Sequence, residues 1–126
     1  MNPLRSRTSV LLAISLAVFA AACHRSGDPP PPMAIEELPG AFQKAFSKAG
    51  ADTKESANEV VVAVQAKDYA KAYAVLQNLL AQSSLTPEQR SATARGLLAV
   101  NSALQSAQAQ GDATAAETLK QIRRNR

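Results

Sequence analysis

From residue 33 to residue 126 the apolar positions recur every third or fourth residue, which is the spacing of one face of an α-helix. No alternating run of β-branched residues bounded by hairpin turns occurs in this stretch. The three consecutive valines that begin at Val60 are flanked by Ala, Glu and Gln, which favour helix. The pattern therefore predicts an all-α body, a small bundle of about five helices.

Two short helices are predicted first. The first has Pro39 in its first turn, ends at Gly50, and carries one apolar face made of Leu38, Phe42, Ala45, Phe46 and Ala49. Asp52 and Glu55 have the spacing of an N-cap residue and its N3 partner, so the second helix is predicted to begin there. Its apolar face consists of Ala57, Val60, Val61 and Val64.

A long helix is predicted to begin after Thr86. Thr is a good N-cap, Pro87 suits the first helical position, and Gln89 stands where a capping box requires it. The helix is expected to run to about residue 110. Its expected apolar face consists of Ala94, Leu97, Leu98, Asn101 and Leu104.

Two further helices are each predicted to follow an aspartate N-cap, Asp68 or Asp112. The helix after Asp68 has the most continuous apolar stripe in the chain: Tyr69, Ala72, Tyr73, Leu76, Leu79 and Leu80. The last helix carries Ala115, Leu119 and Ile122. The two aspartates align at an offset of 44 residues, each at a break between a longer helix and the next, which is a weak internal repeat.

The stretch from Lys67 to Ala72, Lys-Asp-Tyr-Ala-Lys-Ala, resembles the start of the second helix of a tetratricopeptide repeat. The internal offset departs from the about 34-residue period of that family, and other consensus positions are missing. The resemblance implies tetratricopeptide-like antiparallel helical hairpins, and a plain antiparallel bundle is the alternative. Both arrangements bury the same helix faces.

The first 23 residues have a different character. Arg5 and Arg7 precede an uncharged run from Val10 to Ala22. As a helix, a run of 13 residues would rise about 20 Å, which is short for a bilayer core of about 30 Å. A positive start followed by a short apolar run is typical of a secretory signal peptide.

The end of this run, Phe19-Ala20-Ala21-Ala22-Cys23, resembles the lipobox of bacterial lipoproteins, with Ala20 where Leu is usual. The resemblance implies cleavage between Ala22 and Cys23 and acylation of Cys23. An exported protein whose only Cys has no partner also favours modification of that Cys. Two alternatives stay open, namely secretion after ordinary signal-peptidase cleavage and an uncleaved membrane anchor.

Three regions follow: a lipoprotein signal peptide at 1–22, a lipidated Cys with a Pro-rich tether at 23–33, and a helical domain at 34–126 that ends in a basic tail. The tether contains four consecutive prolines, 29–32, which favour an extended, stiff spacer. The predicted location is therefore the bacterial cell envelope, with the lipid facing the periplasm or the exterior. His24 stands where enteric inner-membrane lipoproteins carry Asp, which slightly favours the outer membrane.

Charge and composition narrow the possible functions. The formal net charge is +4, but six of the 14 basic residues lie in the signal segment and at the C-terminus, so the stretch between is slightly acidic. The C-terminal group consists of Lys120, Arg123, Arg124 and Arg126. These side chains complement a helix dipole, or alternatively contact an anionic surface of lipid or cell wall.

No catalytic, metal or cofactor site is expected. The chain has one His and one Cys, no Trp and 4% aromatic residues, which disfavours zinc sites, Cys–His nucleophiles and base-stacking platforms. Glu55 and Glu59 are interpreted as a solvated face, and Tyr69 and Tyr73 as core residues.

The sequence therefore favours a non-enzymatic, lipid-anchored helical protein that binds a protein partner in the envelope through a groove between its hairpins. Leu97 and Leu98 would line that groove if they are not core. No nucleic acid or small-molecule substrate is expected, and the alternatives are a structural spacer or a small secreted hydrolase.

Overall fold

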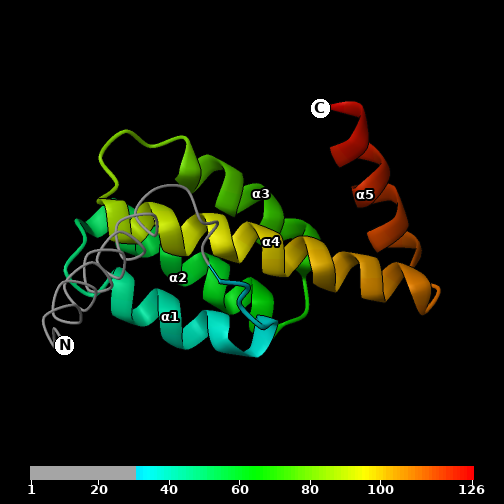
Figure 1. Cartoon of the computed structure of the whole chain (residues 1–126), viewed down its shortest axis with the longest axis horizontal. Helices are drawn as coiled ribbons and strands as arrows, with labels where there is room; N and C mark the ends of the chain where they lie inside the picture. Colours follow the sequence, from blue (N-terminus) through cyan, green and yellow to red (C-terminus); the bar gives the residue numbers. More distant parts are fainter. Residues whose placement is uncertain (1–30) are drawn as a thin grey trace, which may run out of the picture.

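A computed structural model describes residues 31–126, and all regular structure in this range is helical. A 3-10 turn, η2 (Ile35–Glu37), precedes five α-helices (Figure 1): α1 (Leu38–Ala45), α2 (Ala51–Gln65), α3 (Tyr69–Leu80), α4 (Pro87–Ala109) and α5 (Ala113–Arg124). The expected all-α fold of about five helices is confirmed. The predicted signal segment, Ala22, Cys23 and most of the predicted tether lie outside the described residues.

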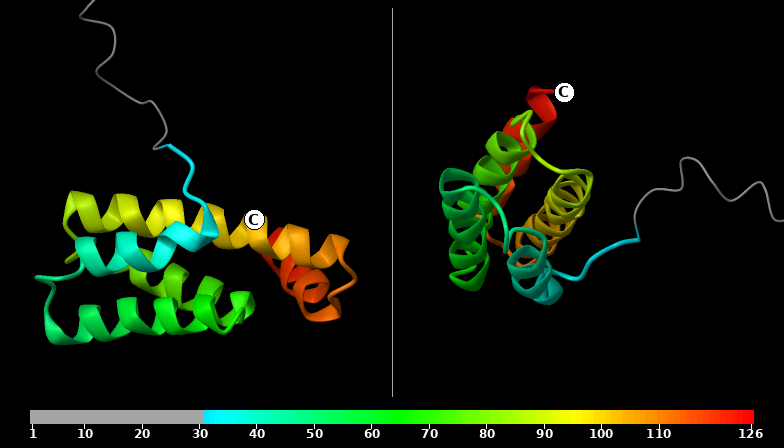
Figure 2. Two further views of the ribbon diagram at one scale, coloured as in Figure 1. Left: turned by 90° about the horizontal axis from the view of Figure 1, so that it is seen from below. Right: turned by 90° about the vertical axis from the view of Figure 1, so that its left-hand side faces the viewer.

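Helices α1 to α4 form a closed up-and-down bundle. Each packs against the next in sequence, and α1 also packs against α4, which completes the ring (Figure 2). Helix α4 has 23 residues and α3 has 12, so one end of α4 extends beyond the bundle. Helix α5 leaves that end at a steep angle and packs against α4 and α3 (Figure 1). No helix in the described range is both long enough and apolar enough to cross a membrane.

The centre of the bundle is filled by large side chains from α1, α3 and α4. Phe42 and Phe46 pack with their ring centroids 5.2 Å apart, in a tilted arrangement that aromatic pairs favour. The other large, fully buried side chains are Leu38, Leu76, Leu79, Leu104, Val60, Val100 and Thr93. The predicted faces of the first, second, third and last helices all contribute to this core.

The predicted core face of α4 is correct at Leu104 but wrong at Leu98. Leu98 is 60% exposed and Leu97 is only partly buried, whereas small residues occupy most of the buried face. That face consists of Gln89, Ala92, Thr93, Gly96, Ala99, Val100 and Leu104. At Gly96 an added Cβ would lie 3.1 Å from Cε2 of Phe42 and 3.2 Å from Cδ2 of Leu76. Helix α4 turns its small side chains inward because the large side chains of α1 and α3 already fill the space.

Three of the predicted N-caps are confirmed. The Oδ1 atoms of Asp68 and Asp112 accept hydrogen bonds from the amides of Lys71 and Ala115, at 3.1 and 3.0 Å. Thr86 forms a reciprocal capping box with Gln89 ahead of Pro87, as expected.

The boundary between α1 and α2 differs from the prediction. Helix α1 ends at Ala45 rather than at Gly50, and Phe46 is buried from the turn that follows. Helix α2 begins at Ala51, because Gly50 is extended and its carbonyl accepts the first helical hydrogen bond. Asp52 therefore lies inside the first turn and caps nothing, so the N-cap predicted there is wrong.

The weak internal repeat corresponds to one shared geometry at two junctions. Before each capping aspartate, a residue with positive φ closes the preceding helix: Lys67 at φ 58° and Gly111 at φ 91°. The amide of Asp68 donates to the Ala63 carbonyl at 2.8 Å, and that of Asp112 to the Ala107 carbonyl at 3.0 Å. These are Schellman motifs, in which the residue that completes one helix end also caps the next helix.

Candidate binding grooves

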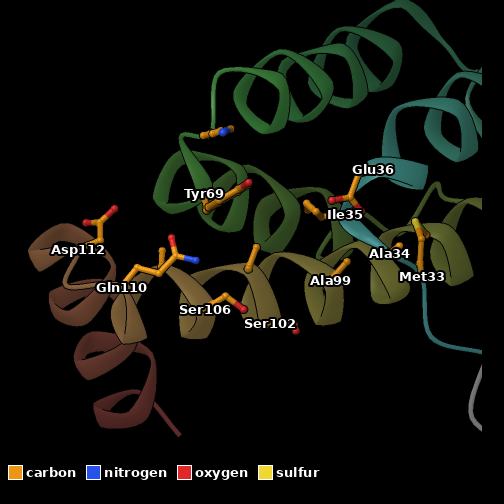
Figure 3. Close-up of a pocket in the computed structure, with 13 residues that line it drawn as sticks. Met33, Ala34, Ile35, Glu36, Tyr69, Ala99, Ser102, Ser106, Gln110 and Asp112 are labelled. Carbon is orange, nitrogen blue, oxygen red and sulfur yellow. The ribbon is translucent and has the colours of Figure 1, made fainter.

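One concave site, the η2–α4 groove, has a volume of about 490 Å³. The segment before α1 contributes Met33 and Ile35, and the start of α3 contributes Tyr69 (Figure 3). The long wall is α4, from Ala99 to Gln110, and Asp112 closes one end. This site lies beside both Schellman junctions, which contribute Lys67 and Asp112 to its lining.

The α4 wall of this groove is made of small residues at helical spacing: Ala99, Ser102, Ala103, Ser106 and Ala107. Polar groups stand along the rim, including Glu36 and Lys67. The oxygen of Asp112 that faces the Ala115 amide is already engaged as a cap. The arrangement offers a shallow surface with few side chains that could hold a ligand tightly.

The segment before α1 is attached to this side of α4. Met33 is 6% exposed and belongs to the hydrophobic core, so packing begins within the region that the sequence assigned to the tether. The Nε atom of Arg95 donates to the Pro31 carbonyl at 2.9 Å. The polypeptide that leads from the N-terminal region therefore reaches the bundle at the edge of the η2–α4 groove.

Leu97 and Leu98 were expected to line a groove only if they were not core residues, and neither lines the η2–α4 groove. Leu97 packs partly against the core, and Leu98 is exposed. Tyr69 and Tyr73, expected in the core, are half-buried and pack against it, and Tyr69 also borders the groove.

A second concave site, the α4–α5 groove, has a volume of about 440 Å³. Three amide side chains from one face of α4 form one wall: Asn101, Gln105 and Gln108. The opposite side comes from α5, with Leu119, Ile122, Arg123 and Arg126. The sequence interpretation missed this site. Amides at positions i, i+4 and i+7 of a helix share one face, so the spacing could have indicated a polar wall.

The structure divides the four C-terminal basic residues into two pairs. Arg123 and Arg126 line the α4–α5 groove, whereas Lys120 and Arg124 are exposed and do not line it. Lys120, Arg123 and Arg124 belong to α5 itself rather than to a tail. The division follows from the 100° step of an α-helix, which places residues 120 and 124 on a different face from 119, 122 and 123. Arg126 follows the end of α5.

Of the polar residues outside the two grooves, Glu59 and Thr93 have side-chain partners. Glu55 is exposed, and Glu59 pairs with Lys71 at 3.2 Å, a largely solvated contact of small energetic value. The buried Thr93 hydroxyl donates to the Gln89 carbonyl at 2.7 Å. Among residues 31–126, no three His, Cys, Asp or Glu side chains gather where a metal ion could bind.

Comparison of the chain with protein-family models, with curated proteins and with solved structures finds no match. Its function is therefore argued from its own residues.

Proposed function

We propose that this protein is a lipid-anchored component of the bacterial cell envelope that acts as a non-catalytic helical binding or scaffold module. The N-terminal segment supports the anchor, because a short uncharged run ends in the lipobox-like sequence before Cys23. Several acyl chains, as lipoproteins of this type carry, hold a protein stably on a membrane, whereas one chain binds only marginally.

The observation that carries the binding role is the pair of open grooves on either side of the projecting half of α4. Their α4 walls carry small and amide side chains, and apolar and charged side chains complete the linings. Such walls suit contact with another polypeptide better than chemistry, since acid–base catalysis requires titratable groups that converge in a cleft. The tetratricopeptide-like sequence of residues 67–72 agrees with a role in protein contact.

The anchor is tested with Cys23→Ala in the producing bacterium. This variant is expected to abolish incorporation of labelled palmitate and to remove the protein from the membrane fraction. His24→Ala, which keeps the thiol, is the matched control and should behave as the wild type does. Unchanged membrane association of Cys23→Ala would contradict the lipoprotein proposal and favour an uncleaved anchor.

The binding role is tested against the spacer alternative by crosslinking in intact cells, followed by purification from membranes. A reproducible, stoichiometric protein partner supports a binding module. If no such partner is found, the result favours a structural spacer without a dedicated partner.

A further inference from the structure

We propose that the α4–α5 groove binds an acidic segment of a partner protein, with Arg123 and Arg126 pairing with its carboxylates. The inference rests on the proposed binding function and names the chemistry of the partner. The two guanidinium groups lie on the α5 side of a groove whose α4 wall carries Asn101, Gln105 and Gln108. No acidic side chain lines this groove.

The two arginines have no acidic partner within the described part of the chain. The ion pair found there joins Lys71 to Glu59, and it involves neither arginine. The Arg123 and Arg126 side chains are exposed at the groove, so they reach a ligand without breaking an internal contact. A guanidinium presents donors in a planar fork that matches a carboxylate with two parallel hydrogen bonds.

The other surfaces of the groove suit a polypeptide. A side-chain amide both donates and accepts, so a row of three can pair with the backbone N–H and C=O groups of an extended segment. Leu119 and Ile122, at 6% and 8% exposure, give an apolar floor that would contact the stems of Glu or Asp side chains. The volume of about 440 Å³ falls within the roughly 300–1,000 Å³ typical of ligand pockets.

The division of the basic residues favours a peptide over a membrane surface. A flat anionic bilayer attracts every exposed cation near it, and Lys120 and Arg124 point outward where such a surface would meet them. The affinity of a segment that occupies the groove depends on Arg123 and Arg126 and only weakly on Lys120 and Arg124. The two pairs carry the same charge, so they provide a matched comparison.

The test measures binding of fluorescent hexaglutamate to the full chain purified in neutral detergent, at about 0.15 M salt, by anisotropy. We expect saturable binding that weakens at least about tenfold in R123Q/R126Q and less than about threefold in K120Q/R124Q. Circular dichroism verifies that both variants are folded. A further variant, Gln105→Glu, adds a negative charge at an exposed site in the groove, where it would repel the negatively charged peptide. It is also expected to weaken binding at least about tenfold.

Equal losses in the two double variants would overturn the proposal, because they would indicate diffuse attraction to the whole basic helix. Absence of hexaglutamate binding to the wild type would also overturn it. So would a result in which vesicles containing phosphatidylglycerol, but not the peptide, lose affinity for R123Q/R126Q. Such failures leave palmitate labelling of Cys23 and a crosslinked partner unaffected, so they are distinguishable from failure of the proposed function.

Discussion

Gly96 lies where α4 comes closest to the large side chains of α1 and α3. An added Cβ there would be 3.1 Å from the Phe42 ring and 3.2 Å from Leu76, which is tighter than ordinary van der Waals contact. Glycine is unfavourable in a helix interior by about 1 kcal/mol relative to alanine. Its presence indicates that close approach of α4 to Phe42 outweighs local helix propensity.

Gly96→Val is expected to lower the free energy of unfolding by about 2–3 kcal/mol, because the added carbons have no room between Phe42 and Leu76. Urea denaturation followed by circular dichroism measures the change. Gly40→Val is the matched control, since an ideal Cβ at that position meets no heavy atom within 4 Å. We expect it to change stability by less than about 0.5 kcal/mol, and equal effects at both glycines would contradict the packing explanation.

At the scale of elements, the junctions α2–α3 and α4–α5 are built in the same way. Each has a residue with positive φ, a hydrogen bond back to the preceding helix, and an aspartate that caps the next one. The chain changes direction within three residues, so each pair of helices packs closely without a long loop. The groove beside these junctions depends on their shared geometry.

Asp68→Ala and Asp112→Ala are each expected to cost about 1 kcal/mol of stability, because each removes an N-cap hydrogen bond. Asp52→Ala is the comparison, since Asp52 lies in the first turn of α2 without capping it. In about 0.5 M salt, which screens the helix dipole, this variant should change stability by less than about 0.3 kcal/mol. A loss at Asp52 as large as that at Asp68 would place the start of α2 elsewhere.

At the scale of the whole molecule, the bundle closes without α5. The contact of α1 with α4 completes the ring, and α5 adds Ala115, Leu119 and Ile122 against the projecting half of α4 and against α3. The two grooves lie on either side of that projecting half, where only part of α4 is covered. The two grooves therefore depend on α4 being longer than the helices it packs against.

A chain that ends at Gln110 is expected to stay helical and to unfold cooperatively, because the four-helix ring is retained. Loss of the Leu119 and Ile122 contacts, partly offset by the entropy of the missing helix, should cost about 2 kcal/mol, or roughly 10 °C in Tm. Thermal denaturation by circular dichroism tests this expectation. Loss of most helical signal at 25 °C would indicate that α5 is required for the bundle to close.

Much of the fold was predictable from local sequence. The N-caps at Asp68, Thr86 and Asp112 depend on hydrogen bonds within a few residues, and the apolar stripe of α3 has a single interpretation. The core face of α4 was not predictable, because the helix has small residues on one side and leucines near another. Which side faces inward depends on the volume that α1 and α3 leave unfilled.

The candidate site also combines features that follow from local sequence with features that depend on packing between helices. Local sequence was enough to predict the helical class and the helix starts with local caps. It also contains the lipobox-like segment and the four basic residues near the C-terminus. Tertiary packing was needed to place Arg123 and Arg126 opposite a row of amides from α4 and to leave Lys120 and Arg124 outside the groove. Capping and periodicity act over a few residues, whereas a groove requires two helices whose relative rotation is set by packing across the whole bundle.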